Sequence, residues 1–224
     1  IMNEELKANG NINFPDEEQF GQFISQYRQL MLLYESAVQC VTVRLDTIGK
    51  EVTIREQRSP IRTVTSRIKE PHSIYEKLKK RGYPLTLESI MEHLNDIAGV
   101  RVICEYLQDV YAIRDALISG DSIRLVQEKD YIKHPKPNGY RSLHMIVDVP
   151  VMLCEGEKYV RCEIQIRTTA MDSWAGLEHN LRYKKYRAQD NNTDQKLKKC
   201  AALLAESDTL MQEIADALGL FWNM

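Results

Sequence analysis

The sequence lacks the short motifs by which many nucleotide-binding and hydrolytic enzymes are identified. It contains no G-x-x-x-x-G-K-[ST] run, which excludes a P-loop enzyme, and no G-x-G-x-x-G run of the dinucleotide-binding type. No glycine is followed by serine, so the dyad that opens many nucleotidyltransferase sites is missing. No histidine is followed by aspartate, so a His-Asp metal hydrolase signature is also missing.

The sequence also has few cysteines, no long apolar run and almost no net charge. Its five cysteines form no C-x-x-C pair, which fits buried thiols in a reducing compartment and excludes a zinc site. No apolar run approaches about 18 residues and no signal peptide is present, so we expect a cytoplasmic protein. A net charge of −2 provides no bulk attraction to DNA or membranes, although local basic clusters can still bind phosphate.

What is present fits one globular domain with a long helix at each end. The 224 residues can bury a full core. Apolar residues recur every three or four positions from Phe20 to Ile48, which predicts a helix over about residues 15–50. This helix packs either on the protein's own sheet or on another subunit. A closing helix is predicted over about residues 193–218, with Thr193 as a candidate N-cap. Its apolar residues form one stripe that suggests a contact between subunits, and they are Leu197, Cys200 or Ala201, Leu204, Met211, Ile214 and Leu218.

Shorter helix and strand signals alternate between these two helices. The predicted helices are Pro71–Gly82, Thr86–Leu94, Asp109–Ser119 and Thr169–Tyr186. The predicted strands are Val100–Tyr106, Ile123–Gln127, Ser142–Val149, Val151–Cys154 and Tyr159–Arg167. We therefore expect an α/β or α+β fold in which helices flank a mixed sheet of about five strands.

The last predicted strand carries an acidic residue on a polar face. Its apolar residues alternate with polar ones, so Glu163 and Gln165 point the same way as Arg161 and Arg167. Such a face is either solvated or the floor of a charged cleft.

Asp96, between a predicted helix and a predicted strand, is a second candidate carboxylate. Alone it could be a capping residue, but two carboxylates on neighbouring elements suit Mg²⁺ that also binds substrate phosphates. The cations that surround it in sequence are Arg67, Lys69, Lys77, Lys80 and Arg101, each of which could alternatively be a solvated surface charge.

Residues 129–144 concentrate cations, tyrosines, prolines and a glycine. Pro135 and Pro137 stiffen this segment, Gly139 permits close approach of the backbone, and Tyr140 offers a flat ring on which a base can stack. The side chains that could bind phosphates are Lys129, Lys136, Arg141 and His144. A basic surface loop is the alternative, but the density of special residues favours a nucleotide clamp.

These segments resemble the synthetase domain of the RelA/SpoT family. The resemblance covers about residues 55–190 and rests on Arg67–Lys69, His93–Arg101, Lys129–Ile132, Pro137–His144, Glu163–Thr168, Ala170–Trp174 and Leu177–His179. Because the chain is little longer than that domain, it is similar to the small alarmone synthetases. The Pro-Lys-Pro-Asn-Gly-Tyr-Arg and Ala-Met-Asp-x-Trp runs are closer to the RelP branch, which is YwaC-like, than to the RelQ branch.

The resemblance implies an activity, a cofactor and an assembly. The activity is transfer of pyrophosphate from ATP to the 3′-hydroxyl of GTP or GDP, giving (p)ppGpp and AMP with Mg²⁺ as cofactor. The resemblance also implies a nucleotidyltransferase-like synthetase fold over residues 1–224 as a single domain, a homotetramer, and neither a hydrolase nor a regulatory domain.

The resemblance assigns roles to individual residues as well. Asp96 and Glu163 would be catalytic and bind the metal, and Glu163 could also accept the proton of the 3′-hydroxyl. The implied ATP-binding residues are Arg67, Lys69, Ser73, Lys77, Lys80 and Arg101. The implied GTP- or GDP-binding residues are Lys129, Lys136, Asn138, Tyr140, His144, Gln165 and Asp172, with Tyr140 stacked on guanine.

Two positions depart from the pattern, and two other functions stay open. Lys129 stands where some relatives have arginine, and Asp172 stands where RelQ-like enzymes have asparagine. The chain could instead transfer pyrophosphate to adenosine nucleotides or to the tRNA 3′ end, or it could be a catalytically silent nucleotide-binding or RNA-binding regulator. Retention of both Asp96 and Glu163 argues against the silent regulator.

Overall fold

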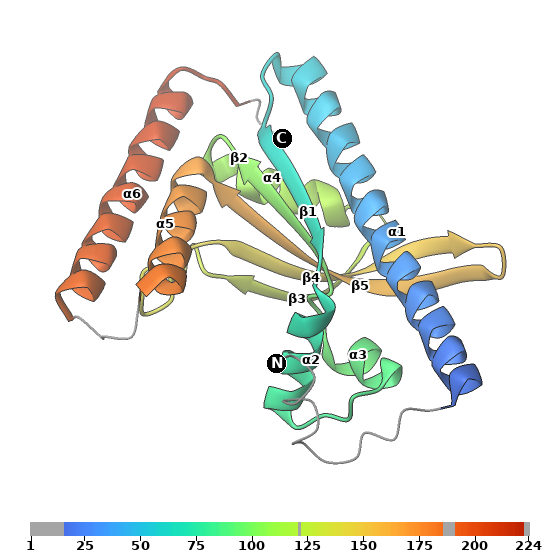
Figure 1. Ribbon diagram of the computed structural model, residues 1–224. Coiled ribbons are helices and arrows are strands. Elements are labelled where there is room, and N and C mark those ends of the chain that lie inside the picture. The colour runs from blue at the N-terminus through green and yellow to red at the C-terminus, as the bar shows by residue number, and fades with distance from the viewer. Residues whose placement is uncertain (1–15, 121, 186–190, 222–224) are drawn as a thin grey trace. The chain divides into compact units, whose positions relative to one another are not determined.

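A computed structural model describes residues 16–120, 122–185 and 191–221 (Figure 1). The helices are α1 (Glu17–Glu56), α2 (Pro71–Arg81), α3 (Leu87–His93), α4 (Leu107–Ile118), α5 (Thr169–Lys185) and α6 (Asn191–Ala217). The strands are β1 (Ile61–Ile68), β2 (Ala98–Cys104), β3 (Arg124–Asp130), β4 (Leu143–Leu153) and β5 (Gly156–Thr168). In those ranges, no helix combines the length and the apolar character that a membrane span requires.

The chain divides into two compact units, residues 1–32 and residues 33–224. In the first unit, the described residues are the beginning of α1, where Asp16 Oδ1 accepts a hydrogen bond of 2.8 Å from the Gln19 backbone N–H. This bond satisfies one of the free N–H groups at the start of the helix. The predicted start of this helix, at about residue 15, lies outside the described residues.

The second unit is built on one five-stranded sheet in the order β1-β2-β5-β4-β3. Strands β2 and β5 are parallel, and every other neighbouring pair is antiparallel. Solvent-facing and buried residues alternate along β5, so Cys162, Ile164 and Ile166 are fully buried while Glu163 and Gln165 face the other side. The predicted mixed sheet with flanking helices and the predicted polar face of this strand are both confirmed.

Helix α4 and the part of α1 that belongs to the second unit lie against the apolar side of the sheet. Arg114 and Tyr111 of α4 bond Glu128 and Asp130 of β3, whose register partners Met145 and Leu143 are buried. In the second unit, α1 buries Tyr34, Ala37, Val38, Val41, Leu45 and Ile48. This part of the predicted apolar stripe therefore packs within the chain, as the simpler of the two expectations proposed.

Two strand predictions need correction. Strand β1 was not predicted because it is an edge strand whose exposed positions include Thr63, Thr65 and Arg67, so it has little apolar alternation. Conversely, the two strands predicted on either side of Pro150 are one strand, β4. Pairing with β3 ends opposite Asp148. On that side, Pro150 therefore has no neighbouring strand to which an N–H would donate, so β4 can continue through the proline.

The predicted apolar stripe of α6 is exposed in its second half. Met211, Ile214 and Leu218 are 39%, 61% and 69% exposed, and the buried positions are instead Ala201, Asp208 and Ala215, seven residues apart. Small residues face inward because other segments approach this helix closely, as described below. Thr193 lies inside α6, which begins at Asn191, so the predicted N-cap is wrong.

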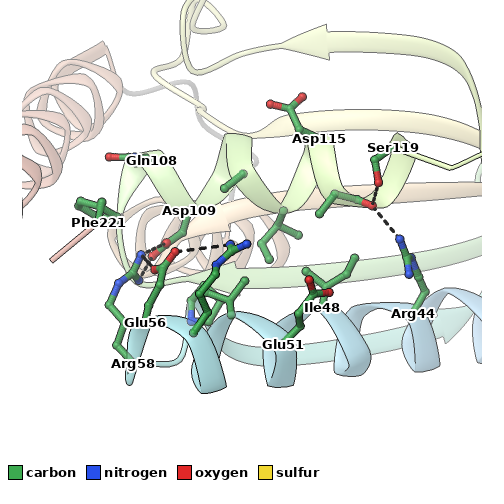
Figure 2. Close-up of a pocket in the computed structure, with 16 residues that line it drawn as sticks. Arg44, Ile48, Glu51, Glu56, Arg58, Gln108, Asp109, Asp115, Ser119 and Phe221 are labelled. Atoms are coloured by element: carbon green, nitrogen blue, oxygen red, sulfur yellow. Dashed lines mark hydrogen bonds and ion pairs between the residues drawn. The ribbon is translucent and has the colours of Figure 1, made fainter. Parts of the chain in front are cut away.

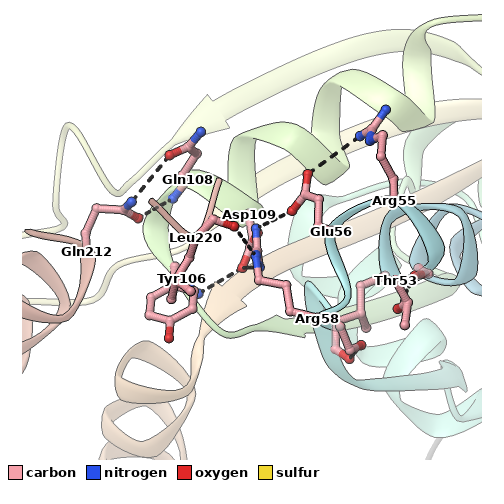
Figure 3. A network of polar contacts seen from close by, with 12 residues as sticks. Thr53, Arg55, Glu56, Arg58, Tyr106, Gln108, Asp109, Gln212 and Leu220 are labelled. Atoms are coloured by element: carbon pink, nitrogen blue, oxygen red, sulfur yellow. Dashed lines mark hydrogen bonds and ion pairs between the residues drawn. The ribbon is translucent and has the colours of Figure 1, made fainter. Parts of the chain in front are cut away.

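A charge pair between part-buried Arg58, two residues after α1, and buried Asp109 joins this segment to the start of α4. The Arg58 guanidinium donates to both carboxylate oxygens of Asp109, at 3.0 and 2.8 Å, and its Nε donates to the carbonyl oxygen of Leu220 at 3.2 Å (Figure 3). The same guanidinium lies 4.4 Å from the centroid of the Phe221 ring. Asp109 is 1% exposed, and burial raises its pKa in spite of the bonds from Arg58. A cavity of about 300 Å³ between α1 and α4 adjoins this pair (Figure 2).

We expect Arg58→Met to destabilise the fold strongly. Removing one partner of a buried ion pair leaves an uncompensated charge, which costs about 3–5 kcal/mol of unfolding free energy. Urea denaturation measures the loss. Arg62→Met is the matched control, because Arg62 lies 3.9 Å from Glu105 in an exposed pair, and it should change stability by less than about 1 kcal/mol. Equal stability of the two variants would contradict the role given to Arg58.

Candidate active site

The polar face of the sheet presents two rows of side chains, which strand register determines. In the first row, Arg67 of β1 lies opposite Gly99 of β2, which lies opposite Glu163 of β5. The second row contains, from β2 to β3, Arg101, Gln165, His144 and Lys129. Residues opposite one another in a sheet point to the same face, so predicted donor and acceptor residues share one surface.

A cleft of about 220 Å³ opens over these rows. Its lining residues come from β1, β2 and β5 and are Thr65, Ser66, Arg67, Gly99, Val100, Arg101, Glu163 and Gln165. Gly99 contributes no side chain between Arg67 and Glu163, which leaves the floor open there. Burial and the neighbouring charge of Arg167 lower the pKa of Arg101, although a guanidinium stays protonated.

Asp96 lies between two lysines of the predicted ATP site. Its Oδ2 accepts hydrogen bonds from Lys69 Nζ at 2.9 Å and from Lys77 Nζ at 2.6 Å. Burial raises the pKa of Asp96, but these two bonds outweigh it, so the pKa lies below its usual value. Its Oδ1 is buried and finds no hydrogen-bond partner among residues 16–120, 122–185 and 191–221. An ionised oxygen of this kind is suited to a cation or a donor from a ligand.

The second carboxylate, Glu163, is held by two side chains of the other row. Gln165 Nε2 donates to Glu163 Oε2 at 3.0 Å, and His144 Nδ1 lies 3.7 Å from Glu163 Oε1. Burial raises the pKa of Glu163 and the charge of Asp96 adds to this effect, but His144 and Gln165 outweigh both and the pKa is lowered. Glu163 is therefore ionised at neutral pH, close enough to Asp96 for their charges to interact.

A closed ring of contacts connects Glu163 to Tyr140. The Tyr140 hydroxyl lies 2.7 Å from His144 Nε2 and accepts a bond of 2.7 Å from Arg167 Nη2, which also donates to Gln165 Oε1 at 2.7 Å. Since Arg167 can only donate, the tyrosine hydrogen is available for Nε2, and His144 can keep its other hydrogen on Nδ1 toward Glu163. Tyr140 is thereby joined to Glu163 through His144 on one side and through Arg167 and Gln165 on the other.

Arg167 also orders the start of α5. Its Nη1 donates to Asp172 Oδ1 at 3.1 Å, and Arg101 Nη1 lies 3.6 Å from the same oxygen. Arg167 is 4% exposed, so this buried guanidinium joins three predicted acceptor residues, namely Tyr140 before β4, Gln165 on β5 and Asp172 on α5. The strand pattern placed Arg167 on the polar face but indicated no role for it.

Residues 131–142, which we call the acceptor loop, place Tyr140 beside other rings. Lys136 Nζ lies 4.5 Å from the centroid of the Tyr131 ring and 4.7 Å from that of Tyr140. The Tyr131 ring meets those of Tyr140 and His144 edge to face, at centroid distances of 6.1 and 5.2 Å. A base that stacks on this side of Tyr140 has to displace Lys136, which frees that cation for a phosphate.

Asn138 and Arg141 of the acceptor loop make hydrogen bonds within the protein that hold the loop in place. Asn138 Oδ1 accepts from the Tyr140 backbone N–H at 3.1 Å, while its Nδ2 donates to Glu178 Oε1 at 3.2 Å. Arg141, expected to bind phosphate, instead donates to buried Asp208 of α6 at 3.1 Å. Asn138 has both its polar groups occupied in this structure, and its predicted contact with the acceptor stays a prediction.

The remaining predicted residues lie at the edges of this surface. Ser73 and Lys80 are exposed on the same side of α2 as Lys77, with Ile74 and Leu78 buried on the other side. Gly82, at φ 72°, ends this helix as the sequence predicted. Lys129 is exposed on β3 at the end of the second row.

Two residues that hold the predicted site residues in place, Arg167 and Asp208, were not identified from the sequence. Arg167 could have been noticed because it is the arginine on the polar face that comes nearest to the helix after β5. Asp208 could have been found from its spacing, since it lies seven residues from both Ala201 and Ala215 in a helix whose small residues face inward.

Comparison with known proteins points to one family. The model described as a region found in RelA/SpoT proteins matches residues 66–188. The GTP pyrophosphokinase YwaC of Bacillus subtilis is 42% identical over 161 residues, which cover 72% of this chain and 77% of that protein. The GTP pyrophosphokinase YjbM of the same organism is 35% identical over 199 residues, covering 89% and 90%.

A solved structure agrees with these sequence matches. The crystal structure of small alarmone synthetase 1 from Bacillus subtilis, bound to its product pppGpp, superposes with a TM-score of 0.77 at 34% identity. The superposition covers 86% of this chain and 97% of that one.

Proposed function

This chain belongs to the RelA/SpoT family, and we propose that it transfers pyrophosphate from ATP to the 3′-hydroxyl of GTP or GDP. In this reaction the 3′-oxygen forms a bond to the β-phosphorus of ATP, the bond from that phosphorus to the α-phosphate oxygen breaks, and AMP leaves. The higher identity to YwaC than to YjbM agrees with the predicted YwaC-like branch.

The donor nucleotide would bind over β1, β2 and α2. Arg67 and Arg101 line the cleft and present planar guanidinium groups, which stack on aromatic rings such as adenine. Lys69 and Lys77 lie together on Asp96 and would attract the triphosphate, with Ser73 and Lys80 further along the exposed side of α2. Cations placed on the transferred group stabilise the negative charge that spreads over it in the transition state.

The acceptor nucleotide would bind over β3, β4 and the acceptor loop. Tyr140 offers its ring to guanine, and its hydroxyl is linked to His144 and Arg167. Lys129 and Lys136 supply positive charge for the acceptor's phosphates, while Gln165 and Asp172 lie within the same contact network. Glu163 is ionised and would accept the proton of the 3′-hydroxyl, a form of assistance worth about 10²–10⁴-fold in rate.

Mg²⁺ fits the two carboxylates of the site. Asp96 offers an ionised, buried oxygen that has no hydrogen-bond partner in the described part of the chain, and Glu163 is a second ionised carboxylate close by. Mg²⁺ commonly binds one or two carboxylates together with substrate phosphates, so a larger protein cage is unnecessary. When bound, the metal would neutralise charge on the transferred phosphates. Asp96 and Glu163 are the residues that we propose hold it.

The observation that carries this proposal is the ring of contacts from Tyr140 through His144 to Glu163, beside the lysine-bound Asp96. The test is incubation of purified protein with labelled ATP, Mg²⁺ and GTP, GDP, ATP or tRNA, followed by separation of the products. We expect labelled pppGpp and ppGpp with GTP and GDP. Transfer only to adenosine nucleotides or tRNA would show that GTP and GDP are not the acceptors. Absence of transfer to any of these acceptors would contradict the proposed activity.

Tyr140 provides a test of acceptor stacking. We expect Tyr140→Leu to raise the KM for GTP by about 10–100-fold, because stacking of a base on an aromatic ring is worth about 1–3 kcal/mol. Tyr140→Phe keeps the ring and loses only the hydroxyl, so its KM for GTP should rise less. Steady-state kinetics with each nucleotide varied in turn measures both effects. A similar rise in the KM for ATP would contradict the assignment of Tyr140 to the acceptor.

We also propose that copies of this chain associate, as a homotetramer. Exposed apolar residues follow one side of α6 and are Leu203, Leu210, Ile214 and Leu218. Contiguous exposed apolar surface of this kind is often buried between protein chains. Light scattering tests the proposal, and a mass of about 26 kDa, that of one chain, would contradict it.

A further inference from the structure

Helix α6 contacts the acceptor loop on both sides of Tyr140. A Cβ atom added at Gly139 would lie only 2.6 Å from Ala201 Cβ, so the loop backbone is pressed against the helix there. On the other side of Tyr140, Arg141 Nη1 donates to Asp208 Oδ2 at 3.1 Å. Ala201 and Asp208 are two helical turns apart and share the buried side of α6. The backbone of Tyr140 therefore lies between two fixed points on one helix.

Asp208 also connects the loop to the start of α5. Its Oδ2 accepts a second hydrogen bond, of 3.0 Å, from the Thr168 hydroxyl at the end of β5. The Thr168 oxygen in turn accepts from the Met171 backbone N–H at 3.2 Å. Met171 directly precedes Asp172, which Arg167 holds. One oxygen atom thus joins both segments that carry predicted acceptor residues.

Stability alone does not explain a buried carboxylate at this position. Asp208 is 2% exposed, and burial raises its pKa while Thr168 and Arg141 oppose that rise. Replacing a buried ion pair by apolar side chains is often neutral or stabilising, so such a pair is weak evidence for stability. The carboxylate instead orients its neighbours, because two hydrogen bonds to one oxygen fix the positions of the donors Arg141 and Thr168. The neighbouring inward positions, Ala201 and Ala215, cannot do this.

We propose that Asp208 is a positioning residue for the acceptor nucleotide. Through Arg141 and Thr168 it fixes Tyr140 and the first turn of α5, so α6 controls the affinity for GTP or GDP although it supplies no residue of the predicted acceptor site. This inference rests on the proposed function, because it assumes that the acceptor stacks on Tyr140. The donor residues Arg67, on β1, and Lys77, on α2, take part in none of these bonds, while Arg101 of β2 is joined to them through its 3.6 Å pair with Asp172.

The test is Asp208→Asn, assayed with each nucleotide varied in turn. The amide keeps the shape of the side chain and can still accept one hydrogen bond, but it no longer balances the charge of Arg141. We expect the KM for GTP to rise about tenfold, while the KM for ATP and kcat change by less than about twofold, because part of the base stacking is lost. Thr168→Val removes the hydrogen bond to Asp208 together with the one that Thr168 accepts from the Met171 N–H, and it should raise the KM for GTP by about threefold, since neutral donors form weaker bonds than charged ones.

Gln212→Ala is the matched control on the same helix. Gln212 Oε1 accepts from the Gln108 backbone N–H at 2.9 Å, which joins α6 to α4 one turn beyond Asp208 (Figure 3). This variant removes a contact between α6 and α4 and leaves the contacts between α6 and the acceptor loop in place, so the KM for GTP should stay unchanged. An equal rise in both variants would mean that general loosening of α6 is responsible, which would overturn the positioning role.

A double-mutant cycle with Arg141→Gln tests the route of the effect. If Asp208 acts through Arg141, the double variant should have the same KM for GTP as Asp208→Asn alone, because coupled residues are not additive. Fully additive effects, or an unchanged KM for GTP in Asp208→Asn, would overturn the inference.

Equilibrium binding separates this inference from the proposed function. Calorimetric titration of GDP into wild-type protein and Asp208→Asn needs no turnover, and we expect about tenfold weaker binding to the variant. If wild-type protein transfers no pyrophosphate but shows this difference, the proposed reaction fails and the positioning role stands. Equal GDP affinity in an active enzyme would overturn the positioning role alone. If Asp208→Asn does not fold, Thr168→Val in the same titration decides, and an affinity equal to that of wild type overturns the inference.

Discussion

Glu163→Gln is expected to lower the rate of pyrophosphate transfer by about 10³-fold or more while leaving the fold intact. Loss of a general base alone accounts for about 10²–10⁴-fold. The same substitution removes one of the two charges that we propose hold Mg²⁺, which adds to the loss. The amide has the volume of the acid and can still accept the hydrogen bond from Gln165, so the connection through Gln165 and Arg167 to Tyr140 is retained. Initial rates with GTP and ATP at saturation, together with thermal denaturation, measure both expectations.

Asp148→Asn is the control for this variant. Asp148 lies on β4 opposite Arg161 of β5, on the same face of the sheet as Glu163 and one row beyond it. It accepts from Arg161 Nε at 2.6 Å and is a comparably placed carboxylate without a predicted role. The control should keep a rate within about threefold of wild type, because surface ion pairs contribute little. A normal rate in Glu163→Gln, or an equal loss in both variants, would remove Glu163 from the mechanism.

The elements of the site that depend on local pattern could be predicted from the sequence. The alternation along β5 separated Glu163 and Gln165 from the buried side, because side chains in a strand alternate with a period of two. The inward side of α2, with Ile74 and Leu78, followed from helical spacing in the same way. The family resemblance then supplied a reaction and candidate roles that no spacing could indicate.

The elements that depend on strand order and on distant contacts could not be predicted. Arg67 comes into the cleft through β1, whose polar edge-strand sequence has no clear strand signal. His144 and Glu163 meet because β4 and β5 pair in one register, and alternation along the two strands predicts the buried face but not which residues lie opposite one another. The inward side of α6 could not be predicted because the apolar stripe with Ile214 and Leu218 is exposed, whereas the close approach of Gly139 requires a small residue and Arg141 requires an acid.

Asp96→Asn is expected to reduce the rate by about 10³-fold with a different kinetic signature from Glu163→Gln. Asp96 balances both Lys69 and Lys77, which accept no hydrogen bonds and remain charged when the carboxylate is lost. The two freed cations should then attract ATP at least as strongly as before, so the KM for ATP should stay the same or fall while kcat drops. If Asp96 holds Mg²⁺, raising the Mg²⁺ concentration should restore part of the rate, because weaker binding is overcome by mass action.

The kinetic signature separates a metal-binding role from a purely structural one. A structural role predicts a lower thermal midpoint and a smaller active fraction, with no dependence on Mg²⁺ beyond that of wild type. Glu92→Gln is the matched control, since Glu92 is an exposed acid on the neighbouring helix α3, 71% exposed in its side chain, and it should behave as wild type in every respect. Asp96 Oδ1 has no hydrogen-bond partner in the described part of the structure. Partial rescue by Mg²⁺ would therefore indicate that this carboxylate binds the metal. A full rate at low Mg²⁺ in Asp96→Asn would contradict that assignment.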